Sequence, residues 1–186
     1  YGVHYAYLRD ASDIMYEVEE IDRTQFEGPV WIAHVALVSH DIDRLVEFYA
    51  NMFDIQPYRR VNKVIGPRVD EVTGLKDARS RAAWFNLDNM VLEIWQYISP
   101  ITPDTGAHRE FEAAGYNKFA FEVSDLHAEV NRLKNIGVTF TSDTLATPIG
   151  REIYATDPDG NRFSLVQLSD EELSISKLDG ISWQTN

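Results

Sequence analysis

The stretch from Trp31 to Tyr49 reads WIAHVALVSHDIDRLVEFY, and it decides the fold. Its first part, up to Val38, is apolar apart from His34, and a short apolar run of this kind predicts a strand. Alternate residues of a strand point to opposite faces, so His34 shares a face with Ala36. Asp41 is a suitable N-cap, and apolar residues then recur at helical spacing. We therefore predict a strand that leads directly into an amphipathic helix.

A second stretch repeats this plan without gaps. Residues 118–133 read KFAFEVSDLHAEVNRL, and the alignment places Lys118 on His34 and Asp125 on Asp41. A repeated strand and helix predict two modules of the same design. The two copies differ at the first-strand position, where one carries an imidazole and the other an ammonium group.

Composition excludes several classes of protein. The 186 residues, 44% of them hydrophobic, are enough for one domain or for two small packed modules. The absence of cysteine excludes disulfides, thiolate metal sites and cysteine nucleophiles. A net charge of -13 argues against a nucleic-acid partner, because phosphate binding needs clustered Lys and Arg. No apolar run approaches the ~18–20 residues of a membrane span, so we expect a cytoplasmic protein without a membrane partner.

Two further strands follow the first helix, and one of them carries a carboxylate. They are expected at residues 81–86 and 90–97, joined by a turn at residues 87–89. In the second strand Glu93 shares a face with Trp95 and Tyr97. We single out Glu93 because a carboxylate is rarely buried without a partner.

The second half of the chain predicts a similar series. We expect a strand at 117–123, a helix at 125–135 that stops at Gly137, and a strand at 138–142. A closing hairpin of residues 152–156 and 163–168 follows, around the turn Asp157-Pro158-Asp159-Gly160.

The N-terminal residues have the plan of that closing hairpin. Aligning the N-terminal segment with the closing hairpin places Tyr7 on Tyr154 and Glu17 on Ser164. We therefore predict that residues 1–20 close an incomplete preceding module. The expected order is then hairpin 1–20, linker 21–30, first module 31–100, connecting loop 101–116, second module 117–168 and tail 169–186. The tail is expected to pack on the body through Leu173, Leu178 and Trp183.

Four segments carry a resemblance to a known family. They are HVALVSHDIDRLVEFY from His34, MVLEIWQY around Glu93, KFAFEVSDLHAEVNRLKNIGV from Lys118 and TDPDGNRFSLVQ from Thr156. Together they resemble the vicinal-oxygen-chelate superfamily, which includes glyoxalase I, extradiol dioxygenases and bleomycin-binding proteins. The resemblance implies an α+β fold in which paired β–α–β–β–β modules form a cup-shaped open barrel.

The resemblance also implies a divalent metal, held by residues on the first and last strands of each module. By position, His34 and Glu93 match these ligands in the first module, and Glu17 matches the last-strand position of the N-terminal hairpin. Iron, manganese, nickel, cobalt and zinc suit imidazole and carboxylate ligands. Glu93 is also the predicted catalytic residue.

The matching positions of the second module are Lys118 and Ser164, which differ from the usual ligands. A protonated lysine repels a cation by about 4 kcal/mol at 4 Å when the effective dielectric constant is ~20. Lys118 would instead either neutralise Glu93 or hold an anionic ligand such as a carboxylate, phenolate or enolate. We therefore predict that Lys118, Ser164, Trp95 and Tyr97 bind substrate.

Three functions remain open on the sequence alone. The first is a metal-dependent lyase, isomerase or dioxygenase acting on a small oxygen-bearing substrate, as a homodimer or as part of a four-module chain. The second is a metal-free protein of the bleomycin-resistance kind that binds a small molecule. The third is a non-catalytic half of a four-module enzyme. The residues expected to line the metal-free cup are Trp84, Phe85, Trp95, Tyr97 and Lys118.

Overall fold

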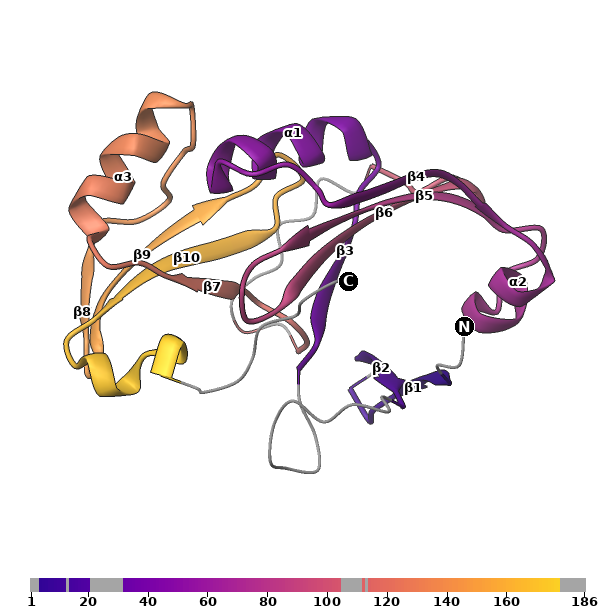
Figure 1. Cartoon of the computed structure of the whole chain (residues 1–186), viewed down its shortest axis with the longest axis horizontal. Helices are drawn as coiled ribbons and strands as arrows, with labels where there is room; N and C mark the ends of the chain where they lie inside the picture. The colour runs from indigo at the N-terminus through magenta and orange to yellow at the C-terminus, as the bar shows by residue number, and fades with distance from the viewer. Residues whose placement is uncertain (1–3, 13, 21–31, 105–111, 113, 178–186) are drawn as a thin grey trace.

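The computed structural model describes residues 4–12, 14–20, 32–104, 112 and 114–177. In this part of the chain, two four-stranded sheets lie beside each other, with helices α1 and α3 on one side of them (Figure 1). A separate two-stranded hairpin, β1–β2, lies on the other side of the first sheet. The predicted α+β class is confirmed, and the open sheets are consistent with a cup.

The first module has the strand order β3–β6–β5–β4. Asp41 caps α1 through a hydrogen bond from the amide of Arg44, as its position before the helix predicts. The turn between β5 and β6 is closed by the amide of Leu87, which donates to the carbonyl of Met90 at 2.9 Å. The elements are β3 (His34–Val38), α1 (Ile42–Phe53), β4 (Arg59–Ile65), α2 (Pro67–Thr73), β5 (Arg79–Asn86) and β6 (Val91–Ser99).

The second module has the strand order β7–β10–β9–β8. Asp125 caps α3 through the amide of Ala128, and Gly137 follows the helix with a φ of 92°, a backbone conformation that favours glycine. The elements are β7 (Phe119–Glu122), α3 (Leu126–Asn135), β8 (Leu145–Thr147), β9 (Gly150–Thr156) and β10 (Arg162–Leu168).

The strand predicted at residues 138–142 is wrong. The edge strand is β8, and within the predicted segment Phe140 forms only an isolated bridge to Ala155. Val138 is 5% exposed and packs in the core. Burial in the core therefore explains the apolar pattern of this segment, although the segment does not join the sheet as a strand.

The two modules repeat at the level of strand register. In the parallel pair β3–β6, Ala36 lies opposite Glu93; in the parallel pair β7–β10, Ala120 lies opposite Ser164. The alignment predicted from sequence therefore holds in three dimensions, and Ser164 occupies the place of Glu93.

Helix α1 joins the modules into one core. The ring of Tyr49 lies 6.5 Å from that of Phe119, and the ring of Phe53 lies 5.2 Å from that of Phe121, both across the module boundary. Tyr49 is fully buried and its hydroxyl donates to Oδ2 of Asp157 at 2.8 Å. The face of each sheet that is turned away from α1 and α3 is called the inner face below.

The hairpin of β1 (Tyr5–Arg9) and β2 (Met15–Glu19) copies the closing hairpin of the second module. Oδ1 of Asp10 accepts hydrogen bonds from the amides of Ser12 and Ile14, at 2.8 and 3.0 Å. Oδ1 of Asp157 accepts from the amides two and four residues further on, at 3.0 and 2.8 Å. The pairing of Tyr7 with Glu17 likewise matches that of Tyr154 with Ser164.

The C-terminal segment, with the short helices η1 (Glu171–Leu173) and η2 (Ile175–Lys177), lies against the inner side of the second sheet (Figure 1). Ser174 is 8% exposed, and its hydroxyl donates to Oε1 of Glu122 at 2.5 Å, while the amide of Ile175 donates to Oε2 at 3.0 Å. Leu173 is 56% exposed, so its predicted packing is wrong: polar contacts hold the segment. Leu178 and Trp183 lie outside the described residues.

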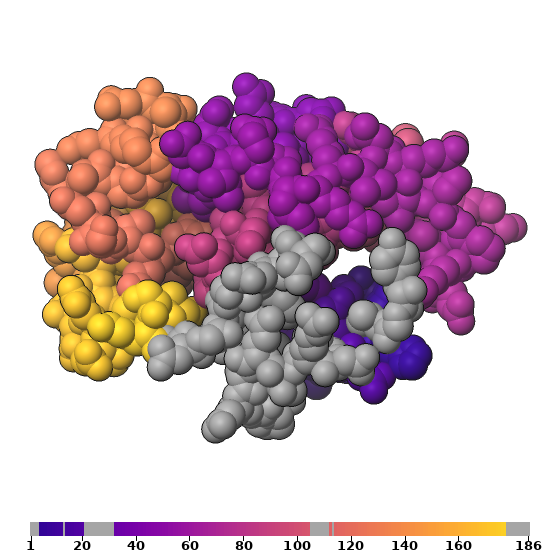
Figure 2. Space-filling view, in the orientation of Figure 1, coloured from indigo at the N-terminus to yellow at the C-terminus, as the bar shows by residue number. Residues whose placement is uncertain are grey.

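The space-filling view shows the two modules and the N-terminal hairpin in different colours (Figure 2). The second module, in orange and yellow, lies beside the first, in purple and magenta, and the hairpin in indigo lies below the first. Of the helices that the structure describes, none is both long and apolar enough to cross a membrane.

Candidate functional site

The inner face of the first sheet gathers most of the predicted site residues. Cross-strand partners form one row over three strands: Arg59 of β4 pairs with Trp84 of β5, and Trp84 pairs with Glu93 of β6. Paired residues point to the same face of a sheet, so this row lies on one surface. Leu92 and Ile94, which alternate with Glu93, are buried in the core on the opposite face.

Two indoles hold the carboxylate of Glu93. The Nε1 atom of Trp84 donates to Oε1 at 2.6 Å, and the Nε1 atom of Trp95 donates to Oε2 at 2.9 Å. The indole rings meet edge to face, with centroids 5.5 Å apart. An indole nitrogen can only donate, whereas a carboxylate has about four acceptor positions. The carboxylate is therefore fixed in orientation and still has lone pairs for another partner.

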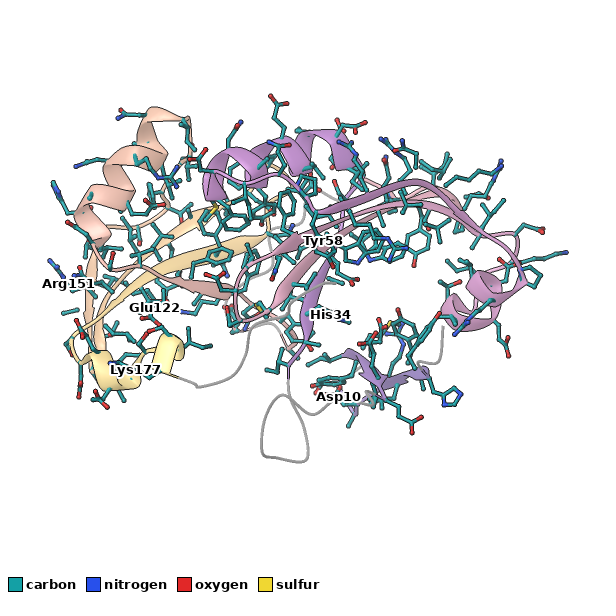
Figure 3. The ribbon with its side chains drawn as sticks, viewed as in Figure 1. Asp10, His34, Tyr58, Glu122, Arg151 and Lys177 are labelled. Carbon is teal, nitrogen blue, oxygen red and sulfur yellow. The ribbon has the colours of Figure 1, made fainter. Side chains whose placement is uncertain are left out.

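His34 and Glu17 form an ion pair between β3 and the hairpin. The Nε2 atom of His34 lies 3.5 Å from Oε2 of Glu17, and the side chains are only 15% and 18% exposed. The hydroxyl of Tyr7 donates to the same carboxylate oxygen at 2.6 Å. In Figure 3, His34 lies on the side of the first sheet that faces the hairpin.

These contacts shift the proton affinities of both groups. Hydrogen bonding to Glu17 raises the pKa of His34 although burial acts to lower it, and the charge of Glu93 adds to the rise. Burial acts to raise the pKa of Glu17, but hydrogen bonds from His34 and Tyr7 outweigh it and lower that pKa. The site therefore favours an imidazolium beside carboxylates.

His34 and Glu93 lie on the same face of the sheet. His34 pairs with Val91, two residues before Glu93 on β6, so the two side chains are diagonal neighbours. The predicted juxtaposition of imidazole and carboxylate is thus present in the structure.

The predicted residues of the second module, Lys118 and Ser164, lie on the inner face of the other sheet, and Lys118 has partners there. The ammonium group of Lys118 pairs with Glu152, and its nitrogen lies 3.2 Å from the hydroxyl oxygen of Tyr154. Ser164 is fully buried. Burial acts to raise the pKa of Glu152, but the hydrogen bond from Lys118 outweighs it and lowers that pKa. The charge of Lys118 is therefore balanced within its own module.

The predicted metal ligands on the inner face of the first sheet already have partners within the protein. Among the residues that the structure describes, no group of three or more His, Cys, Asp or Glu side chains is placed to hold a metal ion. His34 faces Glu17, and both oxygens of Glu93 accept indole N–H groups. The role of His34, Glu93 and Glu17 as metal ligands stays a prediction, and no step proposed below passes through a metal.

The structure corrects one predicted lining residue and adds others. Phe85 is fully buried in the core under α1, so it does not line the inner face. Sequence reasoning missed Arg59, whose guanidinium carbon lies 4.7 Å from the ring centroid of Trp84. Tyr58 directly precedes β4; burial raises its pKa, and the charge of Glu93 adds to the rise. Alternation within a strand shows which residues share a face, but it does not show which strands are neighbours.

Residues 31–165 match the Glyoxalase/Bleomycin resistance protein/Dioxygenase superfamily, and the chain belongs to that family. The fold supports this, because a glyoxalase family protein from Bacillus cereus superposes with a TM-score of 0.66 at 20% identity. That superposition covers 76% of this chain and 97% of the other.

The curated relatives are epimerases. The chain is 27% identical over 127 residues to the mitochondrial methylmalonyl-CoA epimerase of Mus musculus, covering 65% of each chain. It is 25% identical over 114 residues to the enzyme of the same name from Homo sapiens, covering 59% of this chain and 58% of the other. The chain thus spans less than two thirds of the length of either relative.

Proposed function

We propose that the chain catalyses an isomerase-type proton transfer at a carbon atom next to a carbonyl group of a small-molecule substrate. The observation that carries the proposal is the oriented carboxylate of Glu93, fixed by two indoles on the same face as His34. The sequence similarity to two epimerases supports this class of reaction. The proposal is narrower than the family, whose name covers several activities.

In the proposed reaction Glu93 acts as the base. Its carboxylate takes the proton as the C–H bond breaks, and the bonding electrons move to the carbonyl oxygen, which becomes an enolate. The imidazolium of His34, stabilised by Glu17, donates a hydrogen bond to that oxygen. Glu93 then releases its proton to solvent, and a proton from solvent reaches the carbon from the other side, which inverts the centre and restores the carbonyl group.

Inversion of a chiral carbon acid tests the proposal. A single stereoisomer of methylmalonyl-CoA and of related 2-substituted 3-carbonyl thioesters is incubated with the protein, and loss of circular dichroism is followed. We expect inversion of at least one substrate, and a fall of about 100-fold or more in Glu93→Gln, the usual contribution of a general base. Glu47→Gln makes the same charge change on the exposed side of α1 and is the control.

Two outcomes contradict the proposal: no inversion of any substrate in this set, or equal rates for Glu93→Gln and the wild type. The assay is run with chelator and with added iron, manganese, nickel, cobalt or zinc. The added metals test the separate prediction that His34, Glu93 and Glu17 are metal ligands.

A second candidate is a metal-free protein that binds a small molecule without changing it. The edge-to-face pair of Trp84 and Trp95 favours it, because aromatic rings with a few oriented polar groups are typical of ligand sites. Saturable binding of a thioester with no inversion or exchange would support this function over catalysis.

A further inference from the structure

In the part of the chain that the structure describes, Arg59 lies on the inner face of the first sheet and forms no ion pair with a carboxylate. Among the described residues, Arg44, Arg60, Arg81 and Arg132 each form an ion pair with a carboxylate. Arg59 instead lies over the ring of Trp84, and within that part of the chain its guanidinium has no ion pair or hydrogen bond. A guanidinium that keeps its donors while stacked on an indole remains able to bind an oxyanion.

The position of Arg59 relates it to the proposed reacting groups. Arg59, Trp84 and Glu93 are successive cross-strand partners, so β5 alone separates the arginine from the carboxylate. Neighbouring strands lie ~4.8 Å apart, which puts the two backbone positions about 10 Å from each other. The indole of Trp84 bridges this distance, with Arg59 over its ring and Glu93 at its nitrogen.

Arg59 is a local positive charge on an acidic molecule. The chain has a net charge of -13, so an anionic molecule is repelled by most of its surface. Burial is the main cause that raises the pKa of Tyr58. The charge of Glu93 adds to this rise, and the charge of Arg59 opposes it. Figure 3 places Tyr58 on the same side of the sheet as His34. Arg59 therefore offers a positive charge with a phenol nearby, next to the carboxylate site.

We propose that Arg59 binds an anionic group of the substrate, a carboxylate or a phosphate, while the flat or apolar part beside it rests on Trp95. The inference rests on the proposed function and names its substrate class: carbonyl compounds that carry a negative charge a few bonds from the reacting carbon. The anion directs the substrate to the one face where the carboxylate and the imidazolium meet.

Binding of three matched probes tests this inference. The probes are 2-naphthoate, 2-naphthyl phosphate and neutral 2-naphthamide, and affinity is measured by calorimetry. We expect at least one anion to bind more tightly than the amide, and Arg59→Gln to weaken that anion by roughly tenfold while leaving the amide unchanged. The tighter of the two anions identifies the group as carboxylate or phosphate.

The control is the neighbouring Arg60→Gln, because Arg60 pairs with Asp43 of α1 on the other side of the sheet. Arg59→Lys keeps the charge and should recover part of the affinity, which excludes a folding defect as the cause. Equal binding of all three probes to the wild type, or equal losses in Arg59→Gln and Arg60→Gln, would overturn the inference. Probe binding needs no turnover, so the binding test of Arg59 can fail or succeed independently of the inversion assay that tests the proposed function.

Discussion

The Nε2 atom of His34 lies 3.5 Å from Oε2 of Glu17, and this contact joins the N-terminal hairpin to the inner face of the first sheet. The hydroxyl of Tyr7 binds the same carboxylate from within the hairpin. The contact therefore has two consequences: it sets the charge of the imidazole, and it makes docking of the hairpin depend on pH.

The pKa of His34 should fall when Glu17 is neutralised. Hydrogen bonding to Glu17 is the largest cause of the raised pKa, so Glu17→Gln removes most of the rise. The measurement is a titration of the His34 ring by NMR. Glu20→Gln is the matched control, because Glu20 lies 2.8 Å from His4 and not near His34. An unchanged pKa of His34 in Glu17→Gln would show that the ion pair does not exist in solution.

The same pair gives the folded state a defined pH window. Because the folded pKa of His34 is raised, its contribution is complete below the ordinary value of about 6.5 and is lost as the pH rises through the folded value. The pKa of Glu17 is lowered, so its contribution is lost as the pH falls through that value. We expect His34→Gln to flatten the alkaline side of the stability curve, measured by urea unfolding. A curve of unchanged shape would rule out this window.

The two indoles should matter through their N–H groups. Trp84→Phe and Trp95→Phe each keep an aromatic ring but remove one donor to Glu93. Loss of one hydrogen bond costs about 0.5–1.5 kcal/mol, which is up to tenfold in the rate of the proposed inversion. The double variant should lose more than either single variant, measured as turnover at saturating substrate. Full activity in the double variant would mean that the indoles do not position the carboxylate.

Lys118 should act in stability more than in binding. Lys118→Met leaves Glu152, which is 9% exposed, without its cation, so we expect a loss of about 1–3 kcal/mol in the free energy of unfolding. The variant Lys118→Met/Glu152→Gln removes both charges and should recover part of it. If Lys118→Met unfolds like the wild type but binds 2-naphthoate more weakly, the lysine binds ligand instead, as the sequence predicts.

The C-terminal segment should detach when Ser174 is changed. Its hydroxyl and the amide of Ile175 both bind Glu122, so Ser174→Ala removes one charge-assisted hydrogen bond. We expect a loss of about 1–2 kcal/mol and faster tryptic cleavage at Lys177. Glu172→Gln is the control, since its exposed pair with Lys177 spans 3.9 Å and contributes little. Equal cleavage of the two variants would argue against this docking.

Local pattern predicts the repeated part of this fold well. The aspartates that cap α1 and α3, and the alternation that places Glu93 with Trp95, follow from periods that the sequence shows directly. The matching turn hydrogen bonds at Asp10 and Asp157 support the prediction that residues 1–20 close a preceding module, which stays a prediction.

The remaining features depend on tertiary packing. Residues 138–142 have the pattern of a strand because Val138 is buried in the core, while the actual edge strand β8 has only three residues. The partnership of Lys118 with Glu152 depends on β7 and β9 lying on either side of β10, which no local period contains. For the same reason the sequence does not predict a role for Arg59, because its position relative to Glu93 follows only from the order of the strands.

The exchange of the reacting hydrogen with solvent tests the central claim most directly. Methylmalonyl-CoA, or the thioester that is inverted fastest, is incubated in D₂O with the wild type, Glu93→Gln and Glu47→Gln, and deuterium at the carbon next to the carbonyl is measured by NMR. The wild type and Glu47→Gln should incorporate deuterium at the same rate, and Glu93→Gln about 100-fold more slowly. Equal rates in all three proteins, or no incorporation above the buffer rate, would contradict proton transfer by Glu93.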